Sequence, residues 1–309
     1  MTTISRRGLL LGSAGLLLLS GCAPVSGGST DPAKPATPVG PMGISAIPDQ
    51  DPAKLARLYS LVAERFASAT GLHVKYQPVT DYTAVVRAFE VGDIAIAWMG
   101  GLTGVQARSR VAGATAIAQR NIDADFHSLF IATLASGIQP FTELDGLRAL
   151  AGHTFTFGSE TSTSGRLMPE YFIQQSKLDL KNLRGQPGFS GSHDATIAAI
   201  ASGSFEVGAV NEQVWNATVK SGKVDLSKVQ VLWRTPGYSD YHWLARPDVD
   251  KTFGAGTLKS VTKMLLGLNK SNAADAAILD LFGATSFIET KNSNYDQIES
   301  VAKGLGLLA

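Results

Sequence analysis

The chain has few of the residues that usually build metal or redox sites, with one cysteine and five histidines among 309 residues. A single cysteine cannot form a disulfide within the chain, and the scattered histidines show no zinc-binding spacing. Common nucleotide-binding, nucleophile and metalloprotease motifs, such as GxxxxGK[ST], GxGxxG, GxSxG and HExxH, are also missing. We therefore expect no metal, no cofactor and no catalytic residue.

Charge is sparse as well. Charged residues make up 17% of the chain and the formal net charge is +1, so the composition gives no reason to expect a nucleic-acid partner. Hydrophobic residues make up 44%, which is enough to bury one large core or two moderate ones. We expect a two-domain globular body in which any charged ligand is bound by local groups.

Long hydrophobic runs are missing except at residues 8–19, directly after Arg6 and Arg7. This run is shorter than the ~20 apolar residues that span a bilayer, and its setting is typical of a secretory signal peptide. The start, "SRRGLL", also resembles a twin-arginine export signal. The sequence therefore predicts a signal peptide over residues 1–21.

The motif "LSGC" follows the apolar run and ends at Cys22. It resembles the bacterial lipobox, in which the chain is cut before the cysteine and the cysteine receives lipid. Residues 22–41 are rich in proline, glycine and serine, which predicts a flexible tether behind the lipidated cysteine. We expect a protein anchored by lipid to the outer face of the cell membrane.

From residue 42 onward, short apolar runs alternate with amphipathic segments. Asp51 before Pro52 indicates a helix start and Gly71 a helix end. Strands that alternate with helices predict an α/β fold with a parallel sheet. In the first half, strands are expected at 42–47, 72–79 and 93–99 and helices at 51–71, 81–92 and 102–113. In the second half, strands are expected at 153–158, 206–210 and 228–233 and helices at 166–176, 192–203 and 211–222.

Strand-like segments connect the two halves. Residues 114–120 and 126–134 could carry the chain to a second lobe, and 240–247 could carry it back to a helical tail. We expect residues 42–125 plus 245–309 to form the first lobe and residues 126–244 the second. Ligands of open α/β sheets bind at the carboxyl ends of strands, so the cleft between the lobes is the expected site.

The segment "SETSTSG", residues 159–165, places several hydroxyl groups between a strand and a helix. Free backbone N–H groups and the positive end of the helix dipole suit an oxyanion there. Alternatively, Thr163 or Ser164 only caps the helix. Three weaker candidates are His193 and Tyr82, each in a first helical turn, and the pair Asn211 and Glu212 at a strand end. For these, a surface histidine, a packing tyrosine and a helix cap are the alternatives.

The body resembles the periplasmic phosphonate- and phosphite-binding proteins of ABC importers. The resemblance rests on "VTDYTAVVRAFEVGDIAIAWMGG", "FGSETSTSGRLMPEYF", "SGSHDATIAAIASGSFEVGAVNEQVW" and "YSDYHW". It implies a type II periplasmic-binding-protein fold, with two α/β lobes joined by a two-strand hinge. It also implies a monomer whose partners are a membrane permease and a cytoplasmic ATPase.

The resemblance also implies roles for single residues. Ser162, Thr163 and Ser164 would bind a small tetrahedral oxyanion, phosphonate or phosphite above all. Tyr82 would contact the anion from the opposite lobe and His193 from a second helix start. Trp98 and Gly101, in "WMGG", would line the cleft.

One position departs from the family pattern, because Asn211 stands where the family often has an aspartate. An amide repels a dianion less than a carboxylate does, so sulfate or selenate is an alternative ligand. If Glu212 faces the ligand instead, that argument fails. Two further alternatives are an organic-anion or thiamine-precursor receptor of the same fold, and a secreted hydrolase that would need a serine with His193 and Asp194 as a triad.

Overall fold

A computed structural model describes residues 40–308, which form a six-stranded and a five-stranded sheet. The predicted signal peptide, Cys22 and nearly all of the tether lie outside the described residues. All described residues belong to one compact unit. Within residues 40–308, no helix combines the length and the apolar character needed to cross a membrane.

The first sheet has the order β11-β4-β10-β3-β1-β2. Its strands are β1 (Met42–Ala46), β2 (Val74–Tyr76), β3 (Ile96–Met99), β4 (Thr115–Arg120), β10 (His242–Ala245) and β11 (Phe287–Ile288). The predicted parallel pairing is confirmed for β1 with β2 and β3. The segment expected to carry the chain back contains β10, which pairs antiparallel with β3 and β4 because it enters the sheet from the opposite direction.

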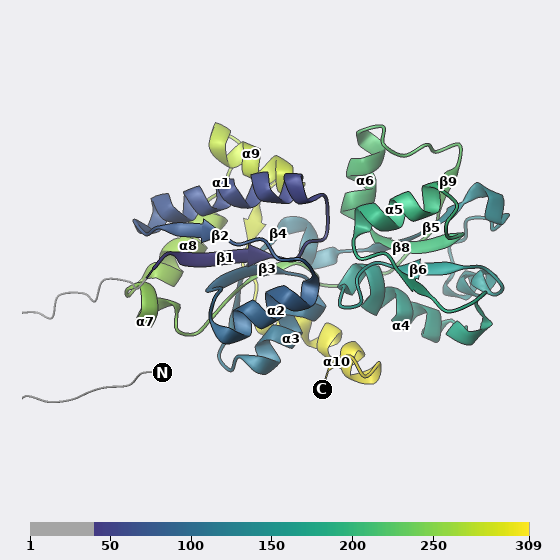
Figure 1. The fold of residues 1–309 in the computed structure, drawn as a ribbon, viewed down its shortest axis with the longest axis horizontal. Coiled ribbons are helices and arrows are strands. Elements are labelled where there is room, and N and C mark those ends of the chain that lie inside the picture. The colour runs from purple at the N-terminus through teal and green to yellow at the C-terminus, as the bar shows by residue number, and fades with distance from the viewer. Residues whose placement is uncertain (1–39, 309) are drawn as a thin grey trace, which may run out of the picture. The chain divides into compact units, whose positions relative to one another are not determined.

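Helices cover both faces of this sheet, with α1 on one side of β1 and β3 and α2 and α3 on the other (Figure 1). The helices of this half are α1 (Pro52–Thr70), α2 (Tyr82–Val91), α3 (Gly101–Arg110), α7 (Val249–Phe253), α8 (Thr257–Leu266), α9 (Ala273–Phe282) and α10 (Asp296–Gly304). The predicted boundaries of α1 are confirmed. Asp51 Oδ1 accepts the Lys54 N–H at 2.9 Å, and Gly71 ends the helix with φ of 72°.

The second sheet has the order β7-β6-β8-β5-β9. Its strands are β5 (Ser128–Thr133), β6 (Phe155–Phe157), β7 (Gly188–Phe189), β8 (Val207–Asn211) and β9 (Val229–Arg234). Its helices are α4 (Met168–Gln175), α5 (His193–Ala201) and α6 (Glu212–Lys220). The strands β6, β7 and β8 are parallel, whereas β5 is antiparallel to both β8 and β9.

The chain passes between the sheets at two adjacent places. A 3₁₀ segment, Asn121–Asp125, leads from β4 to β5, and residues 235–241 lead from β9 back to β10. Phe126 and Tyr238 hydrogen-bond to each other through their backbones, at 2.8 and 3.0 Å. The chain therefore crosses at residues 121–127 and 235–241. These links adjoin the strand-like segments that the sequence suggested, and β10 itself belongs wholly to the first sheet.

Candidate ligand-binding site

Buried polar side chains gather where the ends of strands from the two sheets approach each other. We call this set the polar cluster; each member is at most 3% exposed. It consists of Asp49, Tyr82, Ser162, Thr163, Ser164, His193, Asn211, Asp240 and Tyr241. Burial of so many polar groups costs free energy unless they are hydrogen-bonded. A cluster atom that lacks a protein partner therefore indicates where a polar ligand could bind.

The hydroxyl groups of Ser162, Thr163 and Ser164 have different tasks. Ser162 Oγ accepts the Gly165 N–H at 2.9 Å, so Ser162 caps the π-helical turn Thr163–Leu167 that leads into α4. The alternative that Thr163 or Ser164 is the cap is therefore wrong. Ser164 Oγ is buried and lacks a hydrogen-bond partner within the described residues.

Thr163 connects the two sheets. Its Oγ1 accepts the Leu102 N–H at 3.0 Å and lies near the Asp240 carboxyl, whose pKa the Thr163 hydroxyl lowers. Leu102 belongs to α3, on the first sheet, whereas Thr163 follows β6 of the second. The hydroxyl that the sequence suggested for ligand binding therefore joins the two halves directly.

Tyr82 brings a second unpartnered hydroxyl to the cluster from the first half of the fold. It is the first residue of α2, and its Oη has no partner among residues 40–308. Burial raises the pKa of Tyr82 well above its usual value, and Asp49 raises it further, while the nearby Ser162 hydroxyl lowers it. The phenol therefore keeps its proton and can donate a hydrogen bond.

His193 is the first residue of α5 and is completely buried. Its Nδ1 accepts the Asn211 N–H at 3.3 Å, which leaves the proton on Nε2, 3.4 Å from the Tyr241 hydroxyl. Burial lowers the pKa of His193 to about 3. A buried imidazole stays neutral near pH 7, so His193 adds no positive charge to the cluster, and the alternative of a surface histidine is wrong because the residue is fully buried.

Acidification is expected to destabilise the folded protein through its buried histidines. Burial lowers the pKa of both His193 and His242 to about 3 from 6.5. As the pH falls through this window, the unfolded chain takes up protons that the folded state excludes, so stability is lost. His242→Gln should make the pH slope of the unfolding free energy shallower by about 1.4 kcal/mol per pH unit. Urea unfolding between about pH 4 and about pH 7 measures the slope. The exposed His73 gives the control, His73→Gln, and equal slopes for wild type and His242→Gln would contradict the prediction.

Asn211 faces the polar cluster and Glu212 does not. Asn211 Oδ1 accepts the Val214 N–H at 2.6 Å and so caps α6, while its Nδ2 donates to Tyr241 Oη at 3.0 Å. Glu212 instead forms a two-pronged ion pair with Arg234, at 2.7 and 3.0 Å. Both Glu212 and Arg234 line a groove of about 810 Å³ outside the cluster.

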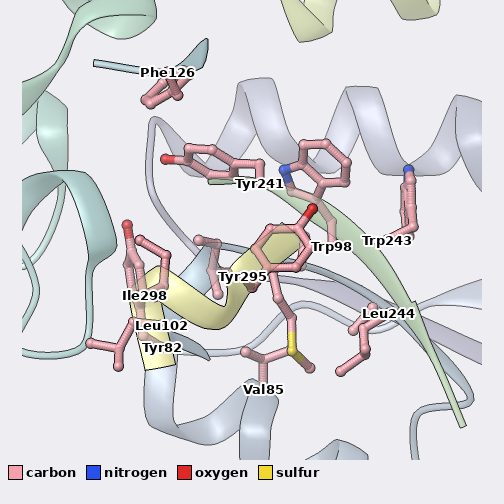
Figure 2. Close-up of a cluster of buried hydrophobic side chains, with 14 of the residues drawn as sticks. Tyr82, Val85, Trp98, Leu102, Phe126, Tyr241, Trp243, Leu244, Tyr295 and Ile298 are labelled. Carbon is pink, nitrogen blue, oxygen red and sulfur yellow. The ribbon is translucent and has the colours of Figure 1, made fainter. Parts of the chain in front are cut away.

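Trp98 and Gly101 support the cluster from the first sheet. Trp98 stacks on Tyr241, with ring centroids 5.8 Å apart, and lies within a group of aromatic rings (Figure 2). The Gly101 N–H, at the start of α3, donates to Asp240 Oδ1 at 2.9 Å. Figure 2 also shows the hydroxyls of Tyr82 and Tyr241 at the same edge of this aromatic group.

Asp240 and Tyr241 are members of the cluster that our sequence analysis did not select. Asp240 Oδ2 is buried without a hydrogen-bond partner within residues 40–308. Burial raises the pKa of Asp240 to about 7, although the Gly101 N–H and the Thr163 hydroxyl lower it. The signal was present in "YSDYHW", but nothing in the sequence shows that this segment passes beside the donor groups.

Tyr241 links residues from several elements through one hydroxyl. Its oxygen lies 3.0 Å from Asn211 Nδ2 and 3.4 Å from His193 Nε2, and its hydroxyl lowers the pKa of the Asp49 carboxyl. Burial raises the pKa of Asp49, and the Tyr241 hydroxyl partly offsets this. Among the residues that the structure describes, the Tyr241 hydroxyl therefore has protein partners, whereas the hydroxyls of Tyr82 and Ser164 have none.

The polar cluster has little positive charge of its own. Arg120 is the one lysine or arginine among residues 40–308 that is fully buried, and Asp123 holds it with contacts of 2.6 and 2.7 Å. Its guanidinium lies over the Tyr241 ring, 4.8 Å from the centroid. An anion in the cluster would be held by neutral donors and would face the Asp240 carboxylate.

A family model for the periplasmic phosphonate substrate-binding proteins of ABC transporters matches residues 44–295. The chain belongs to this family. The matched segment contains every member of the polar cluster. Members of this family are periplasmic substrate-binding proteins of transporters. A transport role agrees with our expectation that the protein is not an enzyme.

Individual relatives agree with the family model. The probable ABC transporter phosphite binding protein PhnD1 of Prochlorococcus marinus is 41% identical over 263 residues, covering 85% of this chain and 89% of that protein. The structure of PhnD1 in complex with methylphosphonate superimposes with a TM-score of 0.84 at 40% identity, covering 86% of this chain and 98% of that one. A binding protein component of an ABC phosphonate transporter from Pseudomonas aeruginosa shares the fold, with a TM-score of 0.72 at 20% identity over 84% of each chain. These structures confirm the type II periplasmic-binding-protein fold that the sequence predicted for this chain.

Proposed function

We propose that the protein captures a small tetrahedral phosphorus oxyanion, phosphite or methylphosphonate in class, and delivers it to an ABC permease. The observation that carries the proposal is that three buried atoms of the polar cluster have no hydrogen-bond partner within residues 40–308: Tyr82 Oη, Ser164 Oγ and Asp240 Oδ2. Buried polar atoms normally have partners, so unpaired donors and an acceptor in one cluster indicate a polar ligand. The methylphosphonate complex of PhnD1 supports the same ligand class.

Asp240 favours a ligand that carries a proton. A phosphonate or phosphite monoanion has a P–OH group that can donate to the carboxylate, whereas its other oxygens accept from Tyr82, Ser164 and backbone N–H groups. Sulfate and selenate have no such proton near neutral pH, and two negative charges in a buried site repel each other strongly. The dianion alternative rested on Asn211, and Asp240 now argues against it.

The hydrolase alternative also loses its support. The Asp194 carboxylate accepts the Asp51 N–H at 2.8 Å, and the His193 ring lies between Asn211 and Tyr241. Asp194 therefore does not orient the imidazole, as a catalytic triad requires. Because the whole cluster is buried, a small anion also fits it better than a thiamine precursor or another large organic anion.

Calorimetric titration tests the ligand class. Methylphosphonate, phosphite, phosphate, sulfate and selenate are each titrated into the protein between about pH 5 and about pH 8. We expect the phosphorus oxyanions to bind and sulfate and selenate to bind much more weakly above about pH 7. Tight sulfate binding with no response to methylphosphonate or phosphite would overturn the proposal.

Binding is proposed to close two lobes over the ligand. The sequence suggested residues 42–125 and 245–309 for the first lobe and 126–244 for the second. Because β10 pairs with strands of the first sheet, we assign residues 242–309 to the first lobe and end the second lobe at residue 241. Hydrogen bonds from both lobes to the anion favour the closed state, and their strength sets how far the population shifts. The partners would be a permease and an ATPase, and the receptor itself would be a monomer.

Cys22 is proposed to carry the lipid that holds the receptor at the outer face of the membrane. Replacing Cys22 by serine is expected to release the protein from the membrane fraction, because the sulfur that receives the lipid is gone. Intact-mass measurement and fractionation of wild type and Cys22→Ser check this. A wild-type protein without added lipid mass would contradict the assignment.

A further inference from the structure

The amino-terminal ends of α1 and α5 face each other across the two halves of the fold. The His193 N–H donates to the Asp49 carbonyl at 3.1 Å, and the Asp51 N–H donates to Asp194 Oδ2 at 2.8 Å. Asp49 and Asp51 precede α1, on the first sheet, whereas His193 and Asp194 begin α5, on the second. Two hydrogen bonds therefore join the halves at a point separate from the crossing segments.

Head-to-head helix ends repel each other unless an anion lies between them, because each end carries a partial positive charge. Asp51 caps its own helix by accepting the Lys54 N–H at 2.9 Å. Asp194 lies in the first turn of α5 and also reaches the α1 end. Its carboxylate therefore neutralises both helix ends at once, but only while they are close together.

The charged groups around this contact agree with that role. Burial lowers the pKa of Lys54, while the nearby carboxylates of Asp49 and Asp194 raise it. Lys54 also lines a small cavity together with Asp51, Asp194 and Lys223. Asp194 does not cap its own helix, because Ser192 Oγ accepts the Ala195 N–H at 3.2 Å and is the N-cap of α5.

The Asp51–Asp194 hydrogen bond lies beside the polar cluster, because neither residue is a member of the cluster but each is close in sequence to one that is. Asp194 follows His193, whose ring packs against the hydroxyl-rich segment at Gly165. A Cβ added at Gly165 would lie only 3.2 Å from His193 Cε1. Separation of the lobes would break the Asp51–Asp194 bond, so the bond contributes only to the closed state. Apparent ligand affinity scales with the fraction of protein in the binding-competent state.

We propose that Asp194 is a positioning residue that latches the lobes through the Asp51 N–H and slows ligand release without touching the ligand. This inference rests on the proposed function, because it assumes that the closed state is the one that holds the anion. The latch also fixes the backbone of His193 against the Asp49 carbonyl. It thereby keeps the imidazole beside Asn211 and Tyr241.

Stopped-flow and calorimetric measurements with methylphosphonate test the latch. Asp194→Ala is expected to raise Kd by about tenfold, the loss typical of one charge-assisted hydrogen bond. The change should come from faster dissociation, with the association rate nearly unchanged. Asp194→Asn keeps an acceptor oxygen without the charge and should fall between wild type and Asp194→Ala. Asp296→Ala removes an exposed acid from the first turn of α10 and is the matched control, expected to leave both rates unchanged.

A distance measurement separates failure of the latch from failure of the proposed function. Cys22→Ser leaves no other cysteine in the full chain, so spin labels can be placed at Val91 and Leu226, which are 63% and 55% exposed. Without ligand, Asp194→Ala should shift the distance distribution towards the open state. An unchanged distribution and an unchanged dissociation rate would overturn the latch. A wild-type protein that ignores methylphosphonate would count against the proposed function instead, and the ligand-free distances would still test Asp194.

Discussion

Replacing Asp240 by asparagine is expected to weaken methylphosphonate binding by about tenfold or more and to strengthen sulfate binding. The carboxylate is a stronger acceptor for a P–OH group than a neutral amide, and Asp240 Oδ2 is buried and unpartnered. The same carboxylate repels a dianion, and an amide does not. Isothermal titration of both anions with wild type and Asp240→Asn, near pH 7.5, measures the change in preference.

The wild-type preference should also depend on pH in a defined direction. Because burial raises the pKa of Asp240 to about 7, the group gains a proton as the pH falls through about 7. Sulfate binding to the wild type should therefore improve on acidification through this range, while Asp240→Asn should show no such step. Asp93→Asn changes an exposed carboxylate and is the control. Equal anion preferences in wild type and Asp240→Asn would show that Asp240 does not face the ligand.

Asp240 should also make the unfolding free energy of the ligand-free protein depend on pH. Its pKa is about 7 in the folded state against 3.8 for the ordinary group, so the folded state holds the proton more tightly. The contribution of Asp240 to stability therefore falls as the pH rises from about 4 to about 7, by up to about 1.4 kcal/mol per pH unit, opposite in sign to the contribution of the buried histidines. Asp240→Asn should lack this contribution, and urea unfolding at both ends of the window will show the difference.

Replacing Gly165 by alanine is expected to abolish tight ligand binding and to lower the unfolding free energy by about 1–3 kcal/mol. The added Cβ would lie 2.9 Å from Ser162 Oγ, 3.2 Å from Gly158 Cα and 3.2 Å from His193 Cε1. The added methyl group has no room, because the Gly158 backbone, the Ser162 hydroxyl that caps the turn and the His193 ring all lie close to this position. The cap from Ser162 and the position of His193 would both have to change.

Gly304→Ala provides the matched control for that prediction. A Cβ at Gly304, the last residue of α10, would meet no atom within 4 Å. Alanine there should leave binding unchanged and alter stability by no more than about 1 kcal/mol. Calorimetry and urea unfolding compare the two variants. Wild-type affinity in Gly165→Ala would show that the packing of this loop against His193 does not matter for the ligand.

Local structure was predictable because local forces decide it. The apolar spacing along α1, its cap at Asp51 and its end at Gly71 are all visible in neighbouring residues, and the structure confirms them. The hydroxyl-rich loop was also correctly placed between a strand and a helix. The cap of that loop was misassigned, because Ser162, Thr163 and Ser164 are chemically alike and only backbone geometry selects one of them.

Long-range features were not predictable from neighbouring residues. The antiparallel direction of β10 depends on where the chain re-enters the first sheet. Asp240 became a site candidate only because residues 235–241 pass beside α3 and the hydroxyl loop, which lie far away in the sequence. The spacing of residues along the chain does not show which distant segments come into contact in the folded protein.

The sequence by itself determined the alternation of strands and helices, the family resemblance and most members of the polar cluster. Those properties depend on side-chain type and on contacts between near neighbours. Only the tertiary structure decided which atoms remain for a ligand: Thr163 joins the two halves, Asn211 turns inward and Glu212 outward, and Asp240 brings in the carboxylate. The physical reason is that burial and hydrogen-bond partners, which control charge and binding, are set by segments that meet only after folding.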